Sequence, residues 1–248
     1  PSSIRAFSDQ MRRETESRAE LREEVAQALD SGQIQPWFQP QISTDTGQIT
    51  GFEALARWNH PVQGMIPPSD FLPAVEEAGL LERLAEVMMY HSFAALKAWD
   101  SSGTEVPQIG VNFAGGELAN PQLIDKVTWE LDRFDLSPER LAIEVLETVV
   151  ASAADDVITR NINALRKLGC RIDLDDFGTG HASIASIRRF SVSRIKIDRS
   201  FVMKAENMDF GQALQLLAQR TGVQLQRRGD PVKSDILHRI NRVAASFY

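Results

Sequence analysis

The sequence has little cysteine, no long hydrophobic run and a shortage of positive charge, and each excludes a class of protein. The one cysteine among 248 residues, Cys170, cannot form a disulfide within the chain or a zinc site of several thiolates, and it suits a reducing cytoplasm. No apolar stretch approaches the roughly 20 residues of a membrane-spanning helix, and the polar, charged start is unlike a signal peptide. With 27 Lys and Arg against 34 Asp and Glu, the net charge of −7 argues against general binding of nucleic acid polymers. We therefore expect a cytoplasmic domain, and the sequence is silent on whether its parent protein is anchored to a membrane.

The composition is that of an ordinary globular protein, with 43% hydrophobic and 25% charged residues. Short apolar runs predict strands at 37–41, 49–58, 109–113, 141–146, 171–176 and 193–198. Amphipathic stretches predict helices near 80–99, 121–134, 154–168 and 182–189. Strand and helix alternate, which predicts an α/β fold with a mainly parallel sheet. About 250 residues is the usual size of a TIM-like (β/α)8 barrel, and a doubly wound open sheet is the alternative that the pattern leaves open.

The first thirty residues differ in character from the rest. Residues 8–30 predict one charged helix whose narrow apolar stripe begins at Leu21, and Gly32 stops it. We expect a linker helix at 1–20, either connecting to an upstream domain or fraying as a terminal helix, and a main domain at 21–248. The chain begins at Pro1 rather than at methionine, so we expect a domain cut from a longer protein.

Polar side chains lie at or near the C-terminal ends of five consecutive expected strands. They are Glu53, Asn112, Glu144 with Glu147, Asp175 with Asp176, and Lys196 with Asp198. In a parallel barrel these strand ends meet on one face. Several carboxylates there repel one another unless a cation lies between them, and oxygen ligands without His or Cys favour Mg²⁺ or Mn²⁺. The pattern predicts a metal site, although a single acid at a strand end is usually a helix cap or a turn former.

Seven segments carry a resemblance to a known family. They are FQPQI (38–42), GFEALARW (51–58), MIPPSDFLPAVEEAGLL (65–81), VNFAG (111–115), IEVLET (143–148), DLDDFGTG (173–180) and KIDRSFV (196–202). In this order they resemble the EAL family of cyclic-di-GMP phosphodiesterases, from about residue 20 to 202. The naming triplet stands here at Glu53-Ala54-Leu55. The resemblance implies a TIM-like (β/α)8 barrel of the EAL type.

The resemblance also implies a metal-dependent active site. Two divalent cations, Mg²⁺ or Mn²⁺, would be bound by Glu53, Asn112, Glu144, Asp175 and Asp176. The first four of these would share one cation, and the two aspartates would hold the second. Lys196 would orient or polarise the nucleophilic water, so the catalytic residues would be Glu53, Asp176 and Lys196. Two cations would stabilise the attacking and leaving oxygens of a phosphodiester.

Substrate contacts and a supporting residue follow from the same resemblance. Gln39, Leu55 and Arg57 would hold the guanine and the phosphate of cyclic-di-GMP, and the guanidinium fork of Arg57 suits a phosphate. Asp198 is grouped with these substrate-binding residues and would also tune the metals. Glu147 would support the loop at 177–183, which in this family couples dimer contacts to metal binding. The implied partners are therefore cyclic-di-GMP, a second copy in a homodimer, and an upstream diguanylate-cyclase-like or sensor domain.

After Val202 the sequence departs from the family pattern. The family's next strand carries a glutamate in an AEGVE-like run, whereas GVQLQRRGDPVKSD (222–235) has none, and a QGY-like final segment is absent. Residues 210–248 thus diverge and leave the last two β/α units unassigned, although helices are expected at 211–222 and 234–245. Either this half is shortened and degenerate, or the sequence lacks segments of the natural chain.

Three hypotheses on function remain at this stage. The first is a phosphodiesterase that opens cyclic-di-GMP to linear pGpG. The second is a catalytically degenerate receptor or regulatory module for the same dinucleotide, and the third is a structural interaction module. We favour the enzyme over the receptor because the chain keeps both the EAL triplet and the paired aspartates, and the structural module leaves the clustered acids unexplained.

Overall fold

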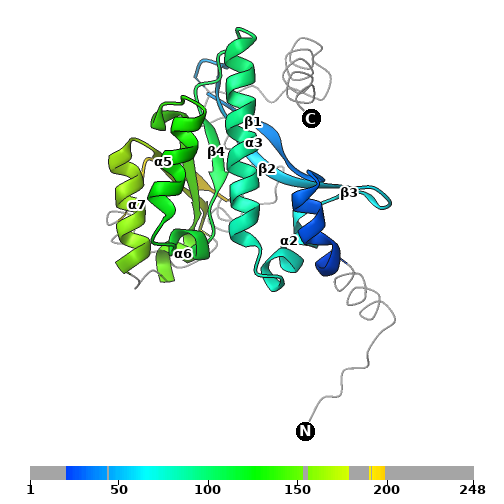
Figure 1. Cartoon of the computed structure of the whole chain (residues 1–248). Helices are drawn as coiled ribbons and strands as arrows, with labels where there is room; N and C mark the ends of the chain where they lie inside the picture. Colours follow the sequence, from blue (N-terminus) through cyan, green and yellow to red (C-terminus); the bar gives the residue numbers. More distant parts are fainter. Residues whose placement is uncertain (1–20, 44, 153–155, 179–189, 191, 199–248) are drawn as a thin grey trace, which may run out of the picture.

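The computed structural model describes residues 21–43, 45–152, 156–178, 190 and 192–198 (Figure 1). Several sequence predictions lie outside these residues. They are the linker helix at 1–20, the helix at 182–189, the divergent segment 210–248 and the two helices expected within it. The helix predicted at 8–30 is described only over 21–30, and these ten residues are helical.

One sheet of seven strands forms the framework of the described residues. The strands are β1 (Ile34–Ile42), β2 (Ile49–His60), β3 (Gly64–Ile66), β4 (Ile109–Asn112), β5 (Leu141–Leu146), β6 (Arg171–Phe177) and β7 (Arg194–Ile197). Their order is β1-β2-β4-β5-β6-β7, with β3 paired to β2. From β2 to β7 every neighbouring pair along this path is parallel, so the prediction of a mainly parallel sheet is confirmed.

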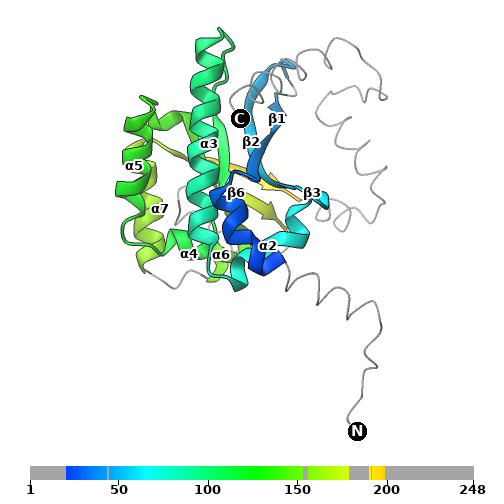
Figure 2. The same ribbon diagram turned by 45° about the vertical axis from the view of Figure 1, so that its right-hand side comes forward.

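The strand order distinguishes a barrel from a doubly wound sheet. A doubly wound sheet reverses its strand order at a switch point and carries helices on both faces. Here the parallel strands β2, β4, β5, β6 and β7 lie beside one another in the order in which they follow along the chain. Helices α3, α5 and α7 lie side by side along one side of this sheet (Figures 1 and 2). This is the arrangement of a β/α barrel.

The first strand runs against the direction of the others. β1 pairs antiparallel with β2, and β3 also pairs antiparallel with β2. The reason is the length of the connections, because a parallel pair needs a crossover of a dozen or more residues. Only residues 43–48 join β1 to β2, and Gly47 in this turn adopts a φ of 67°. β3, with its three residues, was not predicted.

Helices connect the parallel strands along the chain. They are α2 (Pro68–Glu77), α3 (Leu81–Ser101), α4 (Gly115–Leu118), α5 (Leu123–Arg133), α6 (Glu147–Ser152) and α7 (Asp156–Leu168), with a 3-10 turn at Pro138–Arg140. The helices predicted near 80–99, 121–134 and 154–168 are confirmed as α3, α5 and α7. The helices α2, α4 and α6 were not predicted as separate elements. Among the described residues, no helix is both long enough and apolar enough to cross a membrane.

The core lies between this sheet and its helices. Phe38 of β1 and Phe52 of β2 both pack on Trp99 of α3, with ring centroids 4.9 and 5.2 Å apart. Phe52 and Trp99 are fully buried. Because side chains alternate along a strand, the odd-numbered residues of β1 and β2 point the other way, into the barrel. This alternation directs Gln39, Gln41 and Glu53 to the interior.

Candidate metal centre

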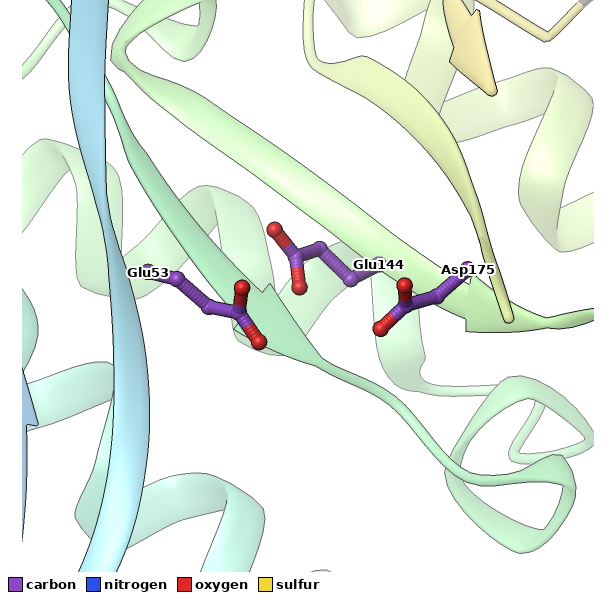
Figure 3. Close-up of side chains that lie close together, drawn as sticks. All are labelled: Glu53, Glu144 and Asp175. Atoms are coloured by element: carbon purple, nitrogen blue, oxygen red, sulfur yellow. The ribbon is translucent and has the colours of Figure 1, made fainter. Parts of the chain in front are cut away.

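A lysine ammonium lies among three carboxylates inside the barrel. Nζ of Lys196, on β7, is 2.8 Å from Oε2 of Glu53 and 2.8 Å from Oε2 of Glu144. It is 3.2 Å from Oδ2 of Asp175. The three carboxylates come from β2, β5 and β6, and Figure 3 shows them directed toward one another. Four strands far apart in the sequence thus supply one charged cluster.

The register of the sheet explains why these side chains meet. Glu53 is aligned with Gly110 of β4, and Glu144 is aligned with Asn112 of β4 and Asp173 of β6. Gly110 leaves the room that the carboxylate of Glu144 occupies, because a Cβ at position 110 would lie 2.3 Å from Oε1 of Glu144. A side chain at position 110 would therefore displace the carboxylate of Glu144 from its present place.

The cluster holds three carboxylates and one ammonium, and Glu144 is its most buried carboxylate. Its side chain is 1% exposed. Burial, and then the negative charge of Glu53, raise the pKa of Glu144 to about 7, while Lys196 opposes this shift. For Lys196, burial favours the neutral form, but the charges and hydrogen bonds of Glu144 and Glu53 outweigh it and raise the pKa of the ammonium.

These residues fit a hard cation. Glu53, Glu144 and Asp175 each offer one oxygen, and the three oxygens lie within 4.8 Å of one another. The Lys196 ammonium already lies where all three carboxylates contact a positive charge. Mg²⁺ and Mn²⁺ prefer such oxygen donors. The donor set and its excess negative charge therefore suit a divalent cation.

The two other predicted ligands lie beside the three clustered carboxylates. Asn112 is the last residue of β4 and is exposed. Asp176 follows Asp175 in β6, is exposed, and has a φ of 53°, and its backbone N–H donates to Oδ1 of Asp175 at 3.0 Å. Partial burial and the negative charges of Asp175 and Asp198 raise the pKa of Asp176. Asp176 is thus electrostatically coupled to the cluster.

The predicted substrate residues line the same interior face. Gln39 is exposed and is paired with Glu53 in the register of β1 and β2. Leu55 and Arg57 follow Glu53 at intervals of two, and both are partly buried. The guanidinium Nη1 of Arg57 donates to the carbonyl of Ala56 at 2.8 Å. Asp198 directly follows β7, and its backbone N–H donates to the carbonyl of Phe177 at 3.1 Å.

The position of Glu147 corrects one prediction. It does not close the strand at 141–146, because β5 ends at Leu146 and Glu147 begins α6. Its side chain is 2% exposed, and Oε2 accepts a hydrogen bond from the backbone N–H of Gly178 at 2.7 Å. Gly178 has a φ of 98°, which favours glycine. The predicted support of the loop at 177–183 thus has a contact at Gly178, the second residue of that loop, and residues 179–183 lie outside the described part of the chain.

Four further interior residues were not singled out from the sequence. Asp173 and Arg194 form an ion pair, and Arg194 also contacts Gln41, which reaches Glu144. Trp37 is 57% exposed and is paired with Leu55 in the register. The signal that could have identified them is the alternation of strand residues, because each stands two residues from a predicted or interior-facing position.

Comparison with known proteins places these features in one family. The model of the EAL domain family matches residues 22–227. The cyclic di-GMP phosphodiesterase NbdA of Pseudomonas aeruginosa is 30% identical over 227 residues, which are 90% of this chain and 29% of NbdA. RocR, a cyclic di-GMP phosphodiesterase of the same organism, is 32% identical over 216 residues, which are 86% of this chain and 54% of RocR. An uncharacterized signaling protein of Caulobacter vibrioides is 35% identical over 85% of this chain and 25% of its own length.

Solved structures agree with the sequence comparisons. The PaMucR phosphodiesterase in complex with c-di-GMP superposes with a TM-score of 0.70 at 29% identity, covering 89% of this chain and 92% of that one. The FimX EAL domain of Pseudomonas aeruginosa bound to c-di-GMP superposes with a TM-score of 0.66 at 26% identity, covering 81% and 80%. The fold is therefore the TIM-barrel type of these domains. The chain spans a quarter to about half of the length of the curated relatives named above.

Proposed function

The chain belongs to the EAL domain family, and from this premise we propose that it is a metal-dependent phosphodiesterase that hydrolyses cyclic-di-GMP to linear 5′-pGpG. The observation that carries the proposal is the cluster of Glu53, Glu144 and Asp175 around Lys196, toward the C-terminal ends of the parallel strands β5, β6 and β7. Catalytic groups of barrel enzymes lie at this end. A phosphodiester repels hydroxide, so its hydrolysis near neutral pH needs concentrated positive charge. A site that binds cations supplies this positive charge.

Each residue of the cluster has a distinct part in this reaction. Glu53, Asn112, Glu144, Asp175 and Asp176 would hold two cations, Mg²⁺ or Mn²⁺. When bound, these cations lower the pKa of a coordinated water and stabilise the attacking and leaving oxygens of the phosphodiester. Glu53 and Asp176 act in catalysis through this binding. Without metal, the raised pKa of Lys196 keeps its ammonium protonated near neutral pH. In the loaded site this ammonium would orient and polarise the water by donating a hydrogen bond.

The substrate is held by residues along the interior face of β1 and β2. Gln39 and Leu55 contact the guanine, and Arg57 contacts the phosphate through its guanidinium fork. Asp198 lies beside the metals and the substrate. Glu147 supports the loop at 177–183 by accepting a hydrogen bond from the backbone N–H of Gly178. The net charge of −7 repels a dinucleotide with two phosphates, so the bound cations supply the attraction.

The proposal extends to the setting of the domain. The relatives that are phosphodiesterases are longer than this chain. The barrel domain at 21–248 would act as a homodimer in the cytoplasm, joined through residues 1–20 to a sensor or diguanylate-cyclase-like domain. In that setting the upstream domain would report a signal and the barrel would adjust the concentration of the second messenger.

A receptor for cyclic-di-GMP is the second candidate. It is favoured by the segment 222–235, which lacks the glutamate that the resemblance leads one to expect there. A receptor would keep the residues that bind the dinucleotide and hold the cations without completing proton transfer. The two candidates differ in turnover and agree in binding.

The test is incubation of the purified domain with cyclic-di-GMP and Mn²⁺, followed by mass spectrometry of the nucleotide. The enzyme converts the dinucleotide to a species heavier by one water, linear pGpG. Glu53→Ala abolishes this conversion while the domain stays folded, and Glu76→Ala, which removes an exposed carboxylate of α2, leaves it unchanged. Normal turnover by Glu53→Ala contradicts the assignment of the site. Intact dinucleotide together with tight binding supports the receptor, and no binding contradicts both candidates.

A further inference from the structure

We propose that Arg194 and Gln41 are positioning residues that fix the orientation of the Glu144 carboxylate for cation binding. The inference rests on the proposed function in one respect only, namely that the carboxylate cluster binds a divalent cation. Arg194 stands two residues before Lys196 on β7. Together with Gln41 it forms a polar layer beneath the cluster, toward the N-terminal ends of the parallel strands. Neither is a ligand in the assignment above. Their effect would be exerted through Glu144.

Contacts join this layer to the cluster in an unbroken series. Nε and Nη2 of Arg194 both donate to Oδ2 of Asp173, the former at 3.1 Å. Nη2 of Arg194 also donates to Oε1 of Gln41 at 3.2 Å. Nε2 of Gln41 in turn donates to Oε1 of Glu144 at 3.4 Å. Strands β6, β7, β1 and β5 are thereby connected across the barrel interior.

We call the series of contacts from Asp173 through Arg194 and Gln41 to Glu144 the relay. Hydrogen-bond chemistry fixes the direction of its contacts. A guanidinium has donors and no acceptor, and an ionised carboxylate has acceptors and no donor. Gln41 lies between the two, so its carbonyl oxygen must face Arg194 and its N–H must face Glu144. Without Arg194 the amide of Gln41 is free to turn its oxygen toward the carboxylate. Arg194 therefore determines that Gln41 presents a donor to Glu144.

The relay completes the set of contacts on Glu144. Oε2 of Glu144 accepts from the Lys196 ammonium at 2.8 Å, and Oε1 accepts from Gln41. Both oxygens of this buried carboxylate are thus held, which sets the plane of the group. Outer contacts of this kind orient metal ligands, and their loss commonly lowers metal affinity by about 10- to 100-fold.

Asp173 anchors the far end of the relay. Its side chain has no exposed surface, and it contributes the charge that holds the guanidinium in place. An ammonium at position 194 could replace the charge but not the planar fork, which reaches Asp173 and Gln41 at once. The lysine variant therefore separates a structural role of Arg194 from a positioning role.

The experiment measures Mn²⁺ affinity by titration calorimetry in the absence of nucleotide, together with thermal unfolding in a chelator. The variants are Gln41→Met, Arg194→Lys and the double variant, with Gln63→Met and Arg83→Lys as controls at exposed positions. We expect each of the two single variants to lower the affinity about tenfold. The double variant should lower it by the same factor, because both changes interrupt one series of contacts. The unfolding temperature of Gln41→Met should stay that of the wild type, because the pair of Asp173 and Arg194 remains.

The outcomes separate this inference from the proposed phosphodiesterase activity. Wild-type affinity in Gln41→Met or Arg194→Lys overturns the relay even when the wild-type domain hydrolyses cyclic-di-GMP. The relay is also overturned if the two losses of Mn²⁺ affinity are independent, so that they multiply to about a hundredfold in the double variant. A wild-type domain that binds no Mn²⁺ also overturns it. A domain that shows the expected affinities but no turnover supports the relay and contradicts the phosphodiesterase.

Discussion

The buried carboxylate of Glu144 should make the metal-free domain less stable as the pH rises. Its pKa is raised from the usual 4.5 to about 7, first by burial and then by the charge of Glu53. The folded chain therefore holds this proton more tightly than the unfolded chain does. Stability from this proton is fully present below pH 4.5 and is lost as the pH rises through 7. The variant Glu144→Gln cannot ionise and should not show the loss.

The size of the effect follows from the shift in pKa. A shift from 4.5 to about 7, at 1.36 kcal/mol per pH unit, corresponds to about 3 kcal/mol. Glutamine keeps an acceptor for Lys196 but offers none to Gln41 at the same time, and one lost hydrogen bond costs about 1 kcal/mol. At pH 8 without metal, Glu144→Gln should thus be more stable than the wild type by about 2 kcal/mol. At pH 5 the order should be level or reversed.

Urea unfolding at pH 5 and pH 8 in a chelator measures this difference, with Glu76→Gln as the control at an exposed carboxylate. Repeating the series with Mn²⁺ should reverse the order at pH 8, because a cation stabilises the ionised carboxylate of the wild type and does little for the amide. Parallel stability curves for wild type and Glu144→Gln across this pH range would refute the reasoning. So would a stabilisation by Mn²⁺ that is equal in the two proteins.

Three further predictions concern single contacts. Gly110→Ala brings a methyl group within 2.3 Å of Oε1 of Glu144, so Mn²⁺ affinity measured by calorimetry should fall at least about tenfold. Glu147→Ala removes the acceptor of the Gly178 backbone N–H, so hydrogen exchange at that amide, followed by mass spectrometry, should accelerate by about tenfold or more. Cys170 is buried, and burial raises its pKa to about 12, so a thiol reagent at pH 8 should label it only after denaturation.

Matched control variants accompany the first two of these predictions. Gly116→Ala adds a methyl group with no heavy atom within 4 Å, so it should leave Mn²⁺ affinity unchanged. Glu139→Ala removes an exposed carboxylate and should leave the exchange of Gly178 as it is. Unchanged metal affinity in Gly110→Ala, unchanged exchange in Glu147→Ala, or rapid labelling of native Cys170 would each contradict the prediction made for that residue.

The sequence was sufficient for those parts of the fold that depend on local pattern. Apolar runs gave the six longer strands, and helical periodicity gave α3, α5 and α7. Glu53, Glu144, Asp175 and Lys196 could be predicted as neighbours, because parallel strands bring their C-terminal ends to one face. The reversed direction of β1 was also within reach of the sequence. The short turn at 43–48 allows a hairpin and excludes a crossover.

What the sequence left open depends on register and on short helices. The helices α4 and α6 have four and six residues, too few for a periodic pattern to identify them. α6 begins immediately after β5, and this is why Glu147 was placed on the strand rather than on the helix. The relay from Asp173 to Glu144 joins residues up to 153 positions apart, and only the sheet register reveals that they meet.

The charges of the barrel interior form the strongest argument for a cation. Barrels of this type usually fill their interior with branched apolar side chains, and burying charge is costly unless it is compensated. The connected network here contains four carboxylates, of Glu53, Glu144, Asp173 and Asp175, and two cationic groups, of Arg194 and Lys196. Among the described residues, two negative charges of this network have no cationic counterpart, which is the charge that one divalent cation carries. Burial is the main cause of the raised pKa of Glu144, and the negative charge of Glu53 adds to it. The excess of negative charge gives the domain a reason to bind metal before any nucleotide arrives.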